Sequence, residues 1–483
     1  MIRVEDTYYM VSTTMHFMPG CEILQSFDLV HWEHVTYVYE TLDHTDAQQL
    51  KSGQNIYGQG MWAASLRYHE GRFYICFVAN DTRKTYLYTS EKIDGPWKKQ
   101  LIEGFYHDGS LLFDEDGRNY IVYGNDEIWI TELNEDLTAP KKDGLHRLLV
   151  SDHKNPELGY EGSHIQKING YYYIFLVHSL RDRWMRTEAC FYSDSLEGEF
   201  TGGDVLCDDR GYCGQGVAQG GIVDTPDGKW YAMLFQDSGA VGRIPILLPV
   251  TWKDHFPVFG QNGHVPEEIE VHSTRPGYIY QPLVGSDDFC NGLLPRWQFN
   301  HDPDPRYYHL DALQGTYTIT TREVCTELTQ AVNTLTQRMS YPSCAAEVTV
   351  DASALKEGDV AGLCALQSCY AAVGITKHHG KYEVLMLDKK EDGILDMTEG
   401  TVVESHQMDF RLEADFCNMK DEARCYYRVN KGDWLPIGTV HKLYFKLDHF
   451  TGCRFGLFCY AAEETGGSAC FRDFKYYDVD EIS

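Results

Sequence analysis

The sequence predicts a nearly all-β protein, a five-bladed β-propeller followed by a β-sandwich, and three observations lead to this fold class. Short aromatic and β-branched runs, bounded by Gly, Asp and Asn, recur along the chain, whereas helical periodicity is hard to find. A turn followed by an aromatic strand repeats at propeller-like intervals through residues 1–275. Beyond that stretch, strand runs alternate with Gly-rich turns in a pattern typical of a sandwich.

The propeller prediction comes from a unit such as Gly170-Tyr-Tyr-Tyr-Ile. Its five copies begin with turns at Asp6, Gly71, Gly117, Gly170 and Gly228. Each blade of a propeller is a four-stranded sheet, and its innermost strand is expected to run just before this turn. Counting nine places back from the four later turns gives the residues that would head the inner strands: Trp62, Asp108, Glu161 and Gln219. Because blades are arranged radially, these side chains are expected to share one axial pocket.

The second domain is predicted from a change in composition and strand pattern after Phe259. A polar stretch leads into strand runs such as Thr316-Tyr-Thr-Ile-Thr and Cys453-Arg-Phe-Gly-Leu-Phe, separated by Gly-rich turns. At 483 residues the chain also exceeds what one hydrophobic core normally serves. We therefore expect a propeller over residues 1–275 and a sandwich over residues 276–483.

Composition limits the partners of the protein. The formal net charge of -30 would repel nucleic acids and anionic membranes, so neutral ligands such as a small saccharide are the expected partners, with a homo-oligomer left open. No apolar run reaches the length of about 18 residues that a bilayer requires. The 15 cysteines are odd in number and contain no CxxC pair, which favours a reducing compartment. The expected location is the cytoplasm, and secretion stays open because a segment before Met1 could carry a signal peptide.

Several strings resemble glycoside hydrolase family 43, the five-bladed β-xylosidases and α-L-arabinofuranosidases. They include Ile2-Arg-Val-Glu-Asp-Thr-Tyr-Tyr-Met, Ser26-Phe-Asp-Leu-Val-His-Trp, Asp108-Gly-Ser-Leu-Leu-Phe and Glu161-Gly-Ser-His-Ile, and a closing-blade match at Gly242-Arg243. The resemblance covers essentially the whole chain, including the C-terminal sandwich of xylosidase-like members.

The resemblance implies roles for several residues. Glu161 matches the general acid, and Asp108 matches the Asp that orients the acid and adjusts its pKa. Trp62 and Arg243 match residues of the terminal sugar subsite. Met15 and Phe17 lie in a segment that is aromatic in many xylosidases and lines the pocket. An inverting enzyme needs this division because one carboxyl group protonates the leaving oxygen while another activates water.

Two positions depart from the family pattern. The family's general base, in an Asp-Pro-Ser-like segment, would fall before Met1, so Asp108 and Glu161 are the carboxylates that this chain supplies. Gln219 stands where many members place a histidine beside an axial metal ion. No cofactor is expected to be required, and calcium beside Gln219 stays an alternative, since an amide oxygen can bind this ion.

The sequence therefore predicts an inverting, exo-acting β-xylosidase or α-L-arabinofuranosidase, or both, acting on xylan-derived or arabinoxylan-derived oligosaccharides. The alternative is a catalytically impaired propeller that binds sugar. We expect hydrolysis of O-glycosyl bonds to depend on Glu161 and Asp108.

Overall fold

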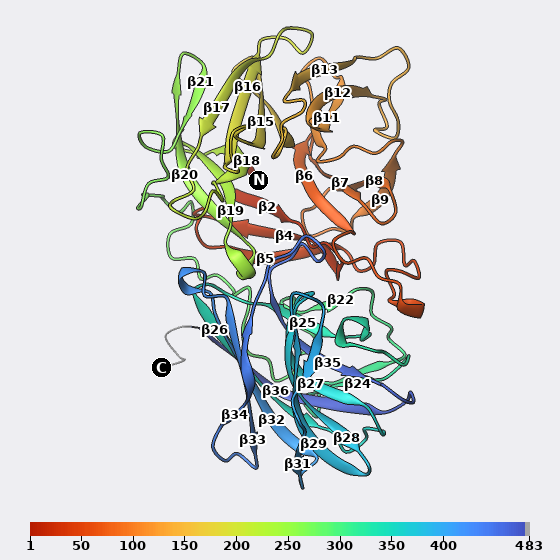
Figure 1. Cartoon of the computed structure of the whole chain (residues 1–483). Coiled ribbons are helices and arrows are strands. Elements are labelled where there is room, and N and C mark those ends of the chain that lie inside the picture. The colour runs from red at the N-terminus through yellow and green to blue at the C-terminus, as the bar shows by residue number, and fades with distance from the viewer. Residues whose placement is uncertain (479–483) are drawn as a thin grey trace.

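The computed structural model of the chain describes residues 1–478, which form two bodies built from strands (Figure 1). In this range the helical elements are four 3-10 turns: η1 (Lys51–Gly53), η2 (Gly239–Val241), η3 (Leu328–Gln330) and η4 (Cys417–Met419). None of the described helical turns is long enough, or apolar enough, to cross a bilayer. The predicted all-β fold class is confirmed.

The first body is a five-bladed propeller, as predicted. Each blade is a four-stranded antiparallel meander. Blade one contains β1 (Ile2–Val4), β2 (Thr7–Ser12), β4 (Gly20–Ser26) and β5 (Glu33–Tyr39); blade two contains β6 (Met61–His69), β7 (Arg72–Ala79), β8 (Lys84–Ser90) and β9 (Lys98–Ile102). Blade three contains β10 (Ser110–Phe113), β11 (Asn119–Asn125), β12 (Glu127–Leu133) and β13 (His146–Ser151). Blade four contains β14 (Glu161–Ile168), β15 (Tyr171–Ser179), β16 (Arg186–Ser193) and β17 (Thr201–Leu206); blade five contains β18 (Ala218–Asp224), β19 (Trp230–Asp237), β20 (Arg243–Lys253) and β21 (Phe256–Phe259).

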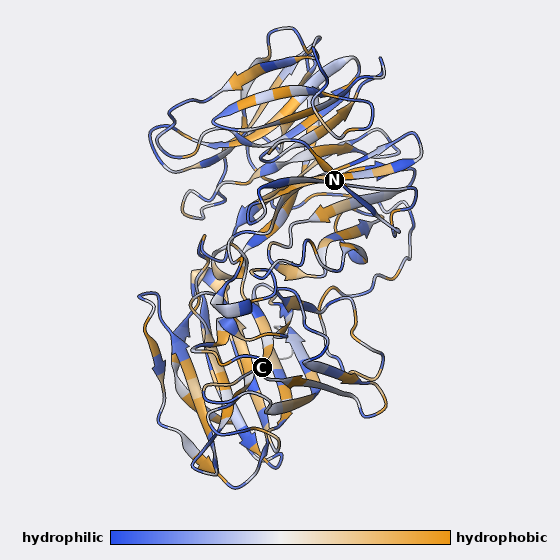
Figure 2. Cartoon of the chain, turned by 90° about the vertical axis from the view of Figure 1, so that its right-hand side faces the viewer, coloured by the Kyte–Doolittle hydropathy of each residue, from blue (hydrophilic) through white to orange (hydrophobic). Residues whose placement is uncertain are grey.

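Apolar side chains between neighbouring blades hold the ring together. Separate buried clusters lie between successive blades, and one containing Tyr8 and Val223 joins blade five to blade one. Arg3 on β1 also forms an ion pair with Asp224 on β18. Orange and blue residues alternate along many strands in Figure 2, as expected where one face is buried and the other contacts water.

The second body is a two-sheet sandwich. One sheet has the order β3-β22-β25-β35-β27-β28-β29-β30, with β31 also paired to β29. Its strands are β3 (Phe17–Met18), β22 (Gln298–Asn300), β25 (Leu335–Arg338), β27 (Val360–Leu366), β28 (Ala371–His378), β29 (Lys381–Lys389), β30 (Leu395–Met397), β31 (Thr401–Val403) and β35 (Arg454–Tyr460). The facing sheet has the order β23-β24-β36-β26-β32-β33-β34. Its strands are β23 (Tyr308–Asp311), β24 (Thr316–Thr320), β26 (Ser343–Asp351), β32 (Gln407–Asp415), β33 (Glu422–Val429), β34 (Leu435–Lys442) and β36 (Ser468–Asp478).

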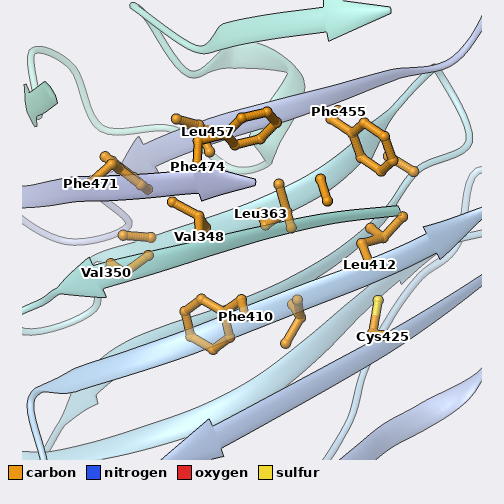
Figure 3. Close-up of a cluster of buried hydrophobic side chains, with 14 of the residues drawn as sticks. Val348, Val350, Leu363, Phe410, Leu412, Cys425, Phe455, Leu457, Phe471 and Phe474 are labelled. Carbon is orange, nitrogen blue, oxygen red and sulfur yellow. The ribbon is translucent and has the colours of Figure 1, made fainter. Parts of the chain in front are cut away.

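The sandwich core lies between these two sheets. Figure 3 shows part of it, including Val348, Leu363, Phe410 and Phe455, all with at most 1% of their surface exposed. Buried apolar surface stabilises the domain by roughly 25 cal/mol per Å² removed from water. The sandwich therefore has a hydrophobic core of its own, separate from the clusters between the propeller blades.

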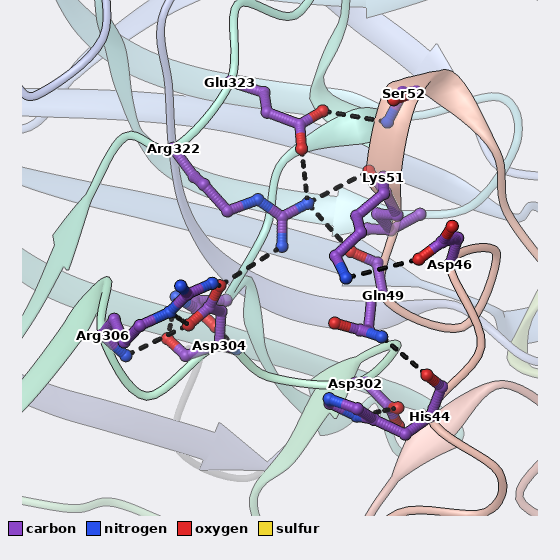
Figure 4. Close-up of polar contacts among 12 residues, drawn as sticks. His44, Asp46, Gln49, Lys51, Ser52, Asp302, Asp304, Arg306, Arg322 and Glu323 are labelled. Atoms are coloured by element: carbon purple, nitrogen blue, oxygen red, sulfur yellow. Dashed lines mark hydrogen bonds and ion pairs between the residues drawn. The ribbon is translucent and has the colours of Figure 1, made fainter.

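The two bodies share a strand. β3 lies between β2 and β4 of the first blade in sequence, yet it pairs with β22 of the sandwich, with Phe17 opposite Asn300. Polar contacts continue the junction in Figure 4, where Arg322 donates to the Gln49 carbonyl (2.9 Å) and His44 contacts Asp302 (2.9 Å). The junction is therefore a fixed interface that positions sandwich side chains over the propeller.

The segment between β21 and β22 returns to the first blade before it enters the sandwich. Arg275 forms an ion pair with Asp6, and the Phe27 amide donates a hydrogen bond to the Tyr280 hydroxyl oxygen (2.8 Å). The predicted division at residues 275 and 276 falls within this packed connection.

Candidate active site

Three inner strands carry a bulge at the residues predicted to face the axis. The pairing register shifts between Met61 and Ala64 in β6, between Glu161 and His164 in β14, and between Ala218 and Gly221 in β18. A bulge turns a side chain away from the regular alternation of the strand. The same local device thus places Trp62, Glu161 and Gln219 at one end of the channel.

These strand ends form a cavity of about 680 Å³ between the propeller and the sandwich. It is lined by all seven residues that the sequence singled out: Met15, Phe17, Trp62, Asp108, Glu161, Gln219 and Arg243. Among the described residues that line it, Asp108 and Glu161 are the only carboxylates. Sandwich residues, including Arg338, Phe445 and Phe450, form the opposite wall.

Asp108 precedes β10 in a left-handed conformation with φ of 48°, which is uncommon for a residue other than glycine. It is 5% exposed, and its Oδ2 accepts a hydrogen bond from the Gly162 amide (3.0 Å). Burial raises the pKa of Asp108 from its ordinary value near 3.8 to about 6; His107 opposes the shift, and the Glu161 charge adds to it. The carboxyl group therefore changes charge near neutral pH.

Glu161 begins β14 and remains partly open to the cavity, with 23% of its side chain exposed. Its Oε2 accepts a hydrogen bond from Asn125 Nδ2 (2.9 Å). The next residue must be glycine: Gly162 has φ of 69°, and a Cβ there would lie 2.7 Å from the Gln219 side chain. This close approach fixes the direction in which Glu161 leaves the strand.

Gln219 is held from behind by a buried acid. The φ of Gln219 is 69°, and its backbone N–H donates to Glu188 Oε2 (2.7 Å). Glu188 has no exposed surface, and burial raises its pKa well above 4.5. Asp108 and Gln219, which both line the cavity, thus share a backbone conformation that is uncommon for residues other than glycine.

Aromatic rings and Arg243 enclose one end of the cavity. The Arg243 guanidinium lies 4.4 Å from the Phe235 ring and 4.6 Å from the Phe450 ring, and its Nε donates to Asp237 (2.9 Å). The Trp62 ring is 5.3 Å from Phe450. Such an arrangement suits a small sugar, because ring faces pack on C–H groups while a fork of N–H donors reaches adjacent hydroxyls.

Met15 and Phe17 form the floor at the domain junction. Both are almost fully buried, at 4% and 2% exposure. Met15 bridges to Met61 in blade two, and Phe17 packs under the Arg454 guanidinium at 4.1 Å. The structure therefore brings these two residues into the cavity wall through the strand shared by both domains.

Four residues near the site were missed by the sequence reasoning: His107, Asn125, Arg338 and Phe450. His107 and Asn125 approach Glu161, at 3.7 Å and 2.9 Å. Arg338 and Phe450 come from the sandwich and occupy no repeated position in a blade, so the propeller register carried no signal for them. His107 directly precedes Asp108 in the sequence, and this position was the only sign that it would lie near the site.

Family comparisons cover both bodies. Residues 1–257 match the family described as "Glycosyl hydrolases family 43", and residues 286–477 match "Beta xylosidase C-terminal Concanavalin A-like domain". A β-xylosidase of Formosa agariphila is 26% identical, with 99% of this chain and 86% of that protein covered. A non-reducing end α-L-arabinofuranosidase of Bacteroides ovatus is 23% identical, with 82% and 77% covered.

Solved structures agree with these matches. A bifunctional GH43-CE protein of Bacteroides eggerthii is 42% identical with a TM-score of 0.92, and it covers the whole of this chain. This chain spans 62% of that bifunctional protein. A GH43 glycoside hydrolase engineered to display both endo-xylanase and exo-arabinofuranosidase activity is 27% identical, with a TM-score of 0.85 and coverage of 99% and 97%.

Proposed function

The chain belongs to glycosyl hydrolase family 43 and is an exo-acting glycosidase, and from this premise we propose that it releases terminal xylose or arabinose from short saccharides. Xylose and arabinose are proposed because relatives along nearly the whole chain carry the names β-xylosidase and arabinofuranosidase. The alternative of a silent sugar-binding propeller is not favoured, since these relatives are named as enzymes.

One observation carries the mechanism: Asp108 and Glu161 meet in the cavity, with carboxylate oxygens within 4.8 Å of each other. That separation is shorter than the roughly 6.5–9.5 Å at which an inverting pair holds a water molecule. Asp108 is therefore placed to act on Glu161 rather than on water. We assign Glu161 as the acid that protonates the leaving oxygen, and Asp108 as the group that adjusts its proton affinity.

Sugar recognition follows from the enclosed end of the cavity. Trp62 and Phe450 provide ring faces for the terminal sugar, and Arg243 provides donors for its hydroxyl groups. Because the sandwich forms the opposite wall, this end accepts the end of a chain rather than its middle. Met15, Phe17 and Gln219 complete the wall and set the shape of the terminal subsite.

We propose that turnover needs no metal ion. Among the described residues, the one group of three His, Cys or acidic ligand atoms within 4.8 Å of one another is His107, Asp108 and Glu161. A metal ion bound there would occupy the carboxylate lone pairs through which Glu161 takes up and gives away its proton. We therefore assign His107, Asp108 and Glu161 to proton transfer rather than to metal binding. Gln219 remains the alternative contact for calcium, as one amide oxygen out of the six to eight oxygens that this ion takes.

Chelation tests this part of the proposal. Dialysis against EDTA is expected to leave kcat/KM unchanged, because no step of the scheme passes through a metal. The comparison is the same sample with added CaCl₂. A loss of turnover on chelation that calcium restores would contradict the assignment and favour the site beside Gln219.

Substrate choice is tested with a matched pair of chromogenic glycosides. Hydrolysis rates are measured for p-nitrophenyl β-D-xylopyranoside and p-nitrophenyl α-L-arabinofuranoside, with the β-D-glucopyranoside as control. The proposal predicts release from one or both pentosides and much slower release from the glucoside, whose extra hydroxymethyl group has to fit the enclosed end. Equal rates on all three would overturn the pentose assignment.

A further inference from the structure

His107 lies beside the two carboxyl groups without being hydrogen-bonded to either. Its Nε2 is 3.7 Å from Asp108 Oδ2 and 3.7 Å from Glu161 Oε2. This atom is buried and has no hydrogen-bond partner among the described residues. Because 3.7 Å exceeds hydrogen-bond length, the interaction with both acids is electrostatic.

The backbone and a neighbouring ring hold His107 in place. The Gly124 amide donates to the His107 carbonyl (3.0 Å), and the Trp62 ring lies 5.8 Å from the imidazole. Asn125, the residue after Gly124, donates to Glu161 Oε2. One hairpin end thus fixes both the histidine and the direction of the Glu161 carboxyl group.

The charge around His107 favours its protonated form. Burial lowers the pKa of the imidazole and Arg83 also lowers it, but Glu161 and Asp108 outweigh both and raise the pKa above its ordinary 6.5. Glu161, Asp108 and Arg83 are the charged groups that act most strongly on the ring. The two carboxyl groups, each 3.7 Å from Nε2, therefore favour the imidazolium form of His107.

We propose that His107 is a positioning residue whose imidazolium stabilises the carboxylate that Glu161 becomes during proton donation. As the glycosidic C–O bond breaks, the proton of Glu161 passes to the leaving oxygen and water forms the new C–O bond at the anomeric carbon. The proton that this water loses passes to the solvent, from which Glu161 regains a proton before the next turnover. The negative charge left on Glu161 lies 3.7 Å from His107 Nε2. This inference rests on the proposed role of Glu161 as the acid.

The contribution of His107 depends on the leaving group. A sugar alkoxide must receive the proton as it departs, whereas p-nitrophenolate leaves as a stable anion and needs little protonation. Loss of His107 should therefore slow the hydrolysis of xylobiose much more than that of the p-nitrophenyl xyloside.

The test is the His107→Gln variant, which keeps a polar side chain and removes the charge. For xylobiose kcat/KM is expected to fall by about tenfold or more, and for the p-nitrophenyl xyloside by less than about threefold. His153→Gln, an exposed histidine that does not line the cavity, is the matched control and should change neither.

Equal losses on the two substrates would overturn the proposal and leave a packing role. Unchanged activity on both would overturn it as well. If the Gln variant does not fold, His107→Asn is a second neutral replacement. Failure of the proposed function itself is recognised separately, because the wild-type chain would then release no pentose from either substrate.

Discussion

At the residue scale, the buried carboxyl group of Asp108 lowers the stability of the fold when it is charged. Its folded-state pKa, about 6, lies above the ordinary value near 3.8, so the folded state binds the proton more tightly than the unfolded state. Unfolding therefore becomes easier as pH rises from about 4 to about 6. A buried charge kept for chemistry is a recurrent reason for such a cost.

The Asp108→Asn variant is expected to be more stable than wild type at pH 7 and indistinguishable at pH 4, because both side chains are neutral at the lower pH. Asn retains an oxygen that can accept from the Gly162 amide. Thermal unfolding at both pH values measures the effect, with a Tm increase of a few degrees expected at pH 7. The same gain at pH 4 would mean that the charge of Asp108 is not its cause.

The spacing of the repeats predicted that Trp62, Asp108, Glu161 and Gln219 share one pocket, and all four line the cavity. The prediction was possible because equivalent positions in the blades of a propeller surround the same axis. The contacts of these residues were not predictable in the same way. The bond from Asn125 to Glu161 and the approach of Gln219 to Gly162 join different blades, and neither follows from sequence spacing.

At the scale of the element, the turn that carries Phe450 connects the sandwich to the catalytic cavity. It precedes β35, and the Phe450 amide donates to the Lys446 carbonyl (2.7 Å), with φ of 55° at Phe450. The ring contacts Trp62 and Arg243, which belong to the propeller. This turn is therefore expected to help bind the terminal sugar without taking part in proton transfer.

Replacing Phe450 by Ala is expected to raise KM about 5-fold to 15-fold, corresponding to roughly 1–1.5 kcal/mol for a lost aromatic contact. The value of kcat should change little. Steady-state kinetics on xylobiose tests this, with Phe445→Ala in the same turn region as a comparison. A large fall in kcat with unchanged KM would contradict a binding role for the ring.

The strand exchange by β3 was not predictable from its sequence. Phe17 and Met18 have the apolar character of a blade strand, and only the tertiary structure pairs them with β22. The five repeats, in contrast, gave the number of blades correctly because each carries its own turn and aromatic strand. Local signals thus specify the blades, whereas long-range pairing decides where the two domains join.

At the scale of the whole molecule, an ion pair between a buried carboxylate and a partly exposed arginine joins the domains. Glu22 on β4 is 4% exposed and pairs with Arg338 on β25. Burial raises the pKa of Glu22, but Arg338 and His34 outweigh burial, so the net pKa is lowered below 4.5. Its stabilising contribution is therefore present above pH 4.5 and is lost as pH falls through the folded-state pKa.

The Glu22→Gln variant is expected to unfold at a lower temperature than wild type at pH 7, by an amount equivalent to about 2 kcal/mol, since the partner Arg338 remains partly exposed. The difference should shrink below about pH 4 as Glu22 of the wild type becomes protonated. Calorimetry at both pH values measures it. Glu91→Gln, at an exposed pair with Arg72, should have no effect, and an equal loss there would contradict the account.

The central claim is that Glu161 is the proton donor of a glycosidase, and its most direct test is the release of xylose from xylobiose by the wild-type chain and by Glu161→Gln. The account predicts turnover by the wild type and a loss of about 10²-fold to 10⁴-fold in the variant, with the same Tm within a few degrees. Unchanged release of xylose by the folded variant would contradict the assignment of Glu161 and the mechanism built on it.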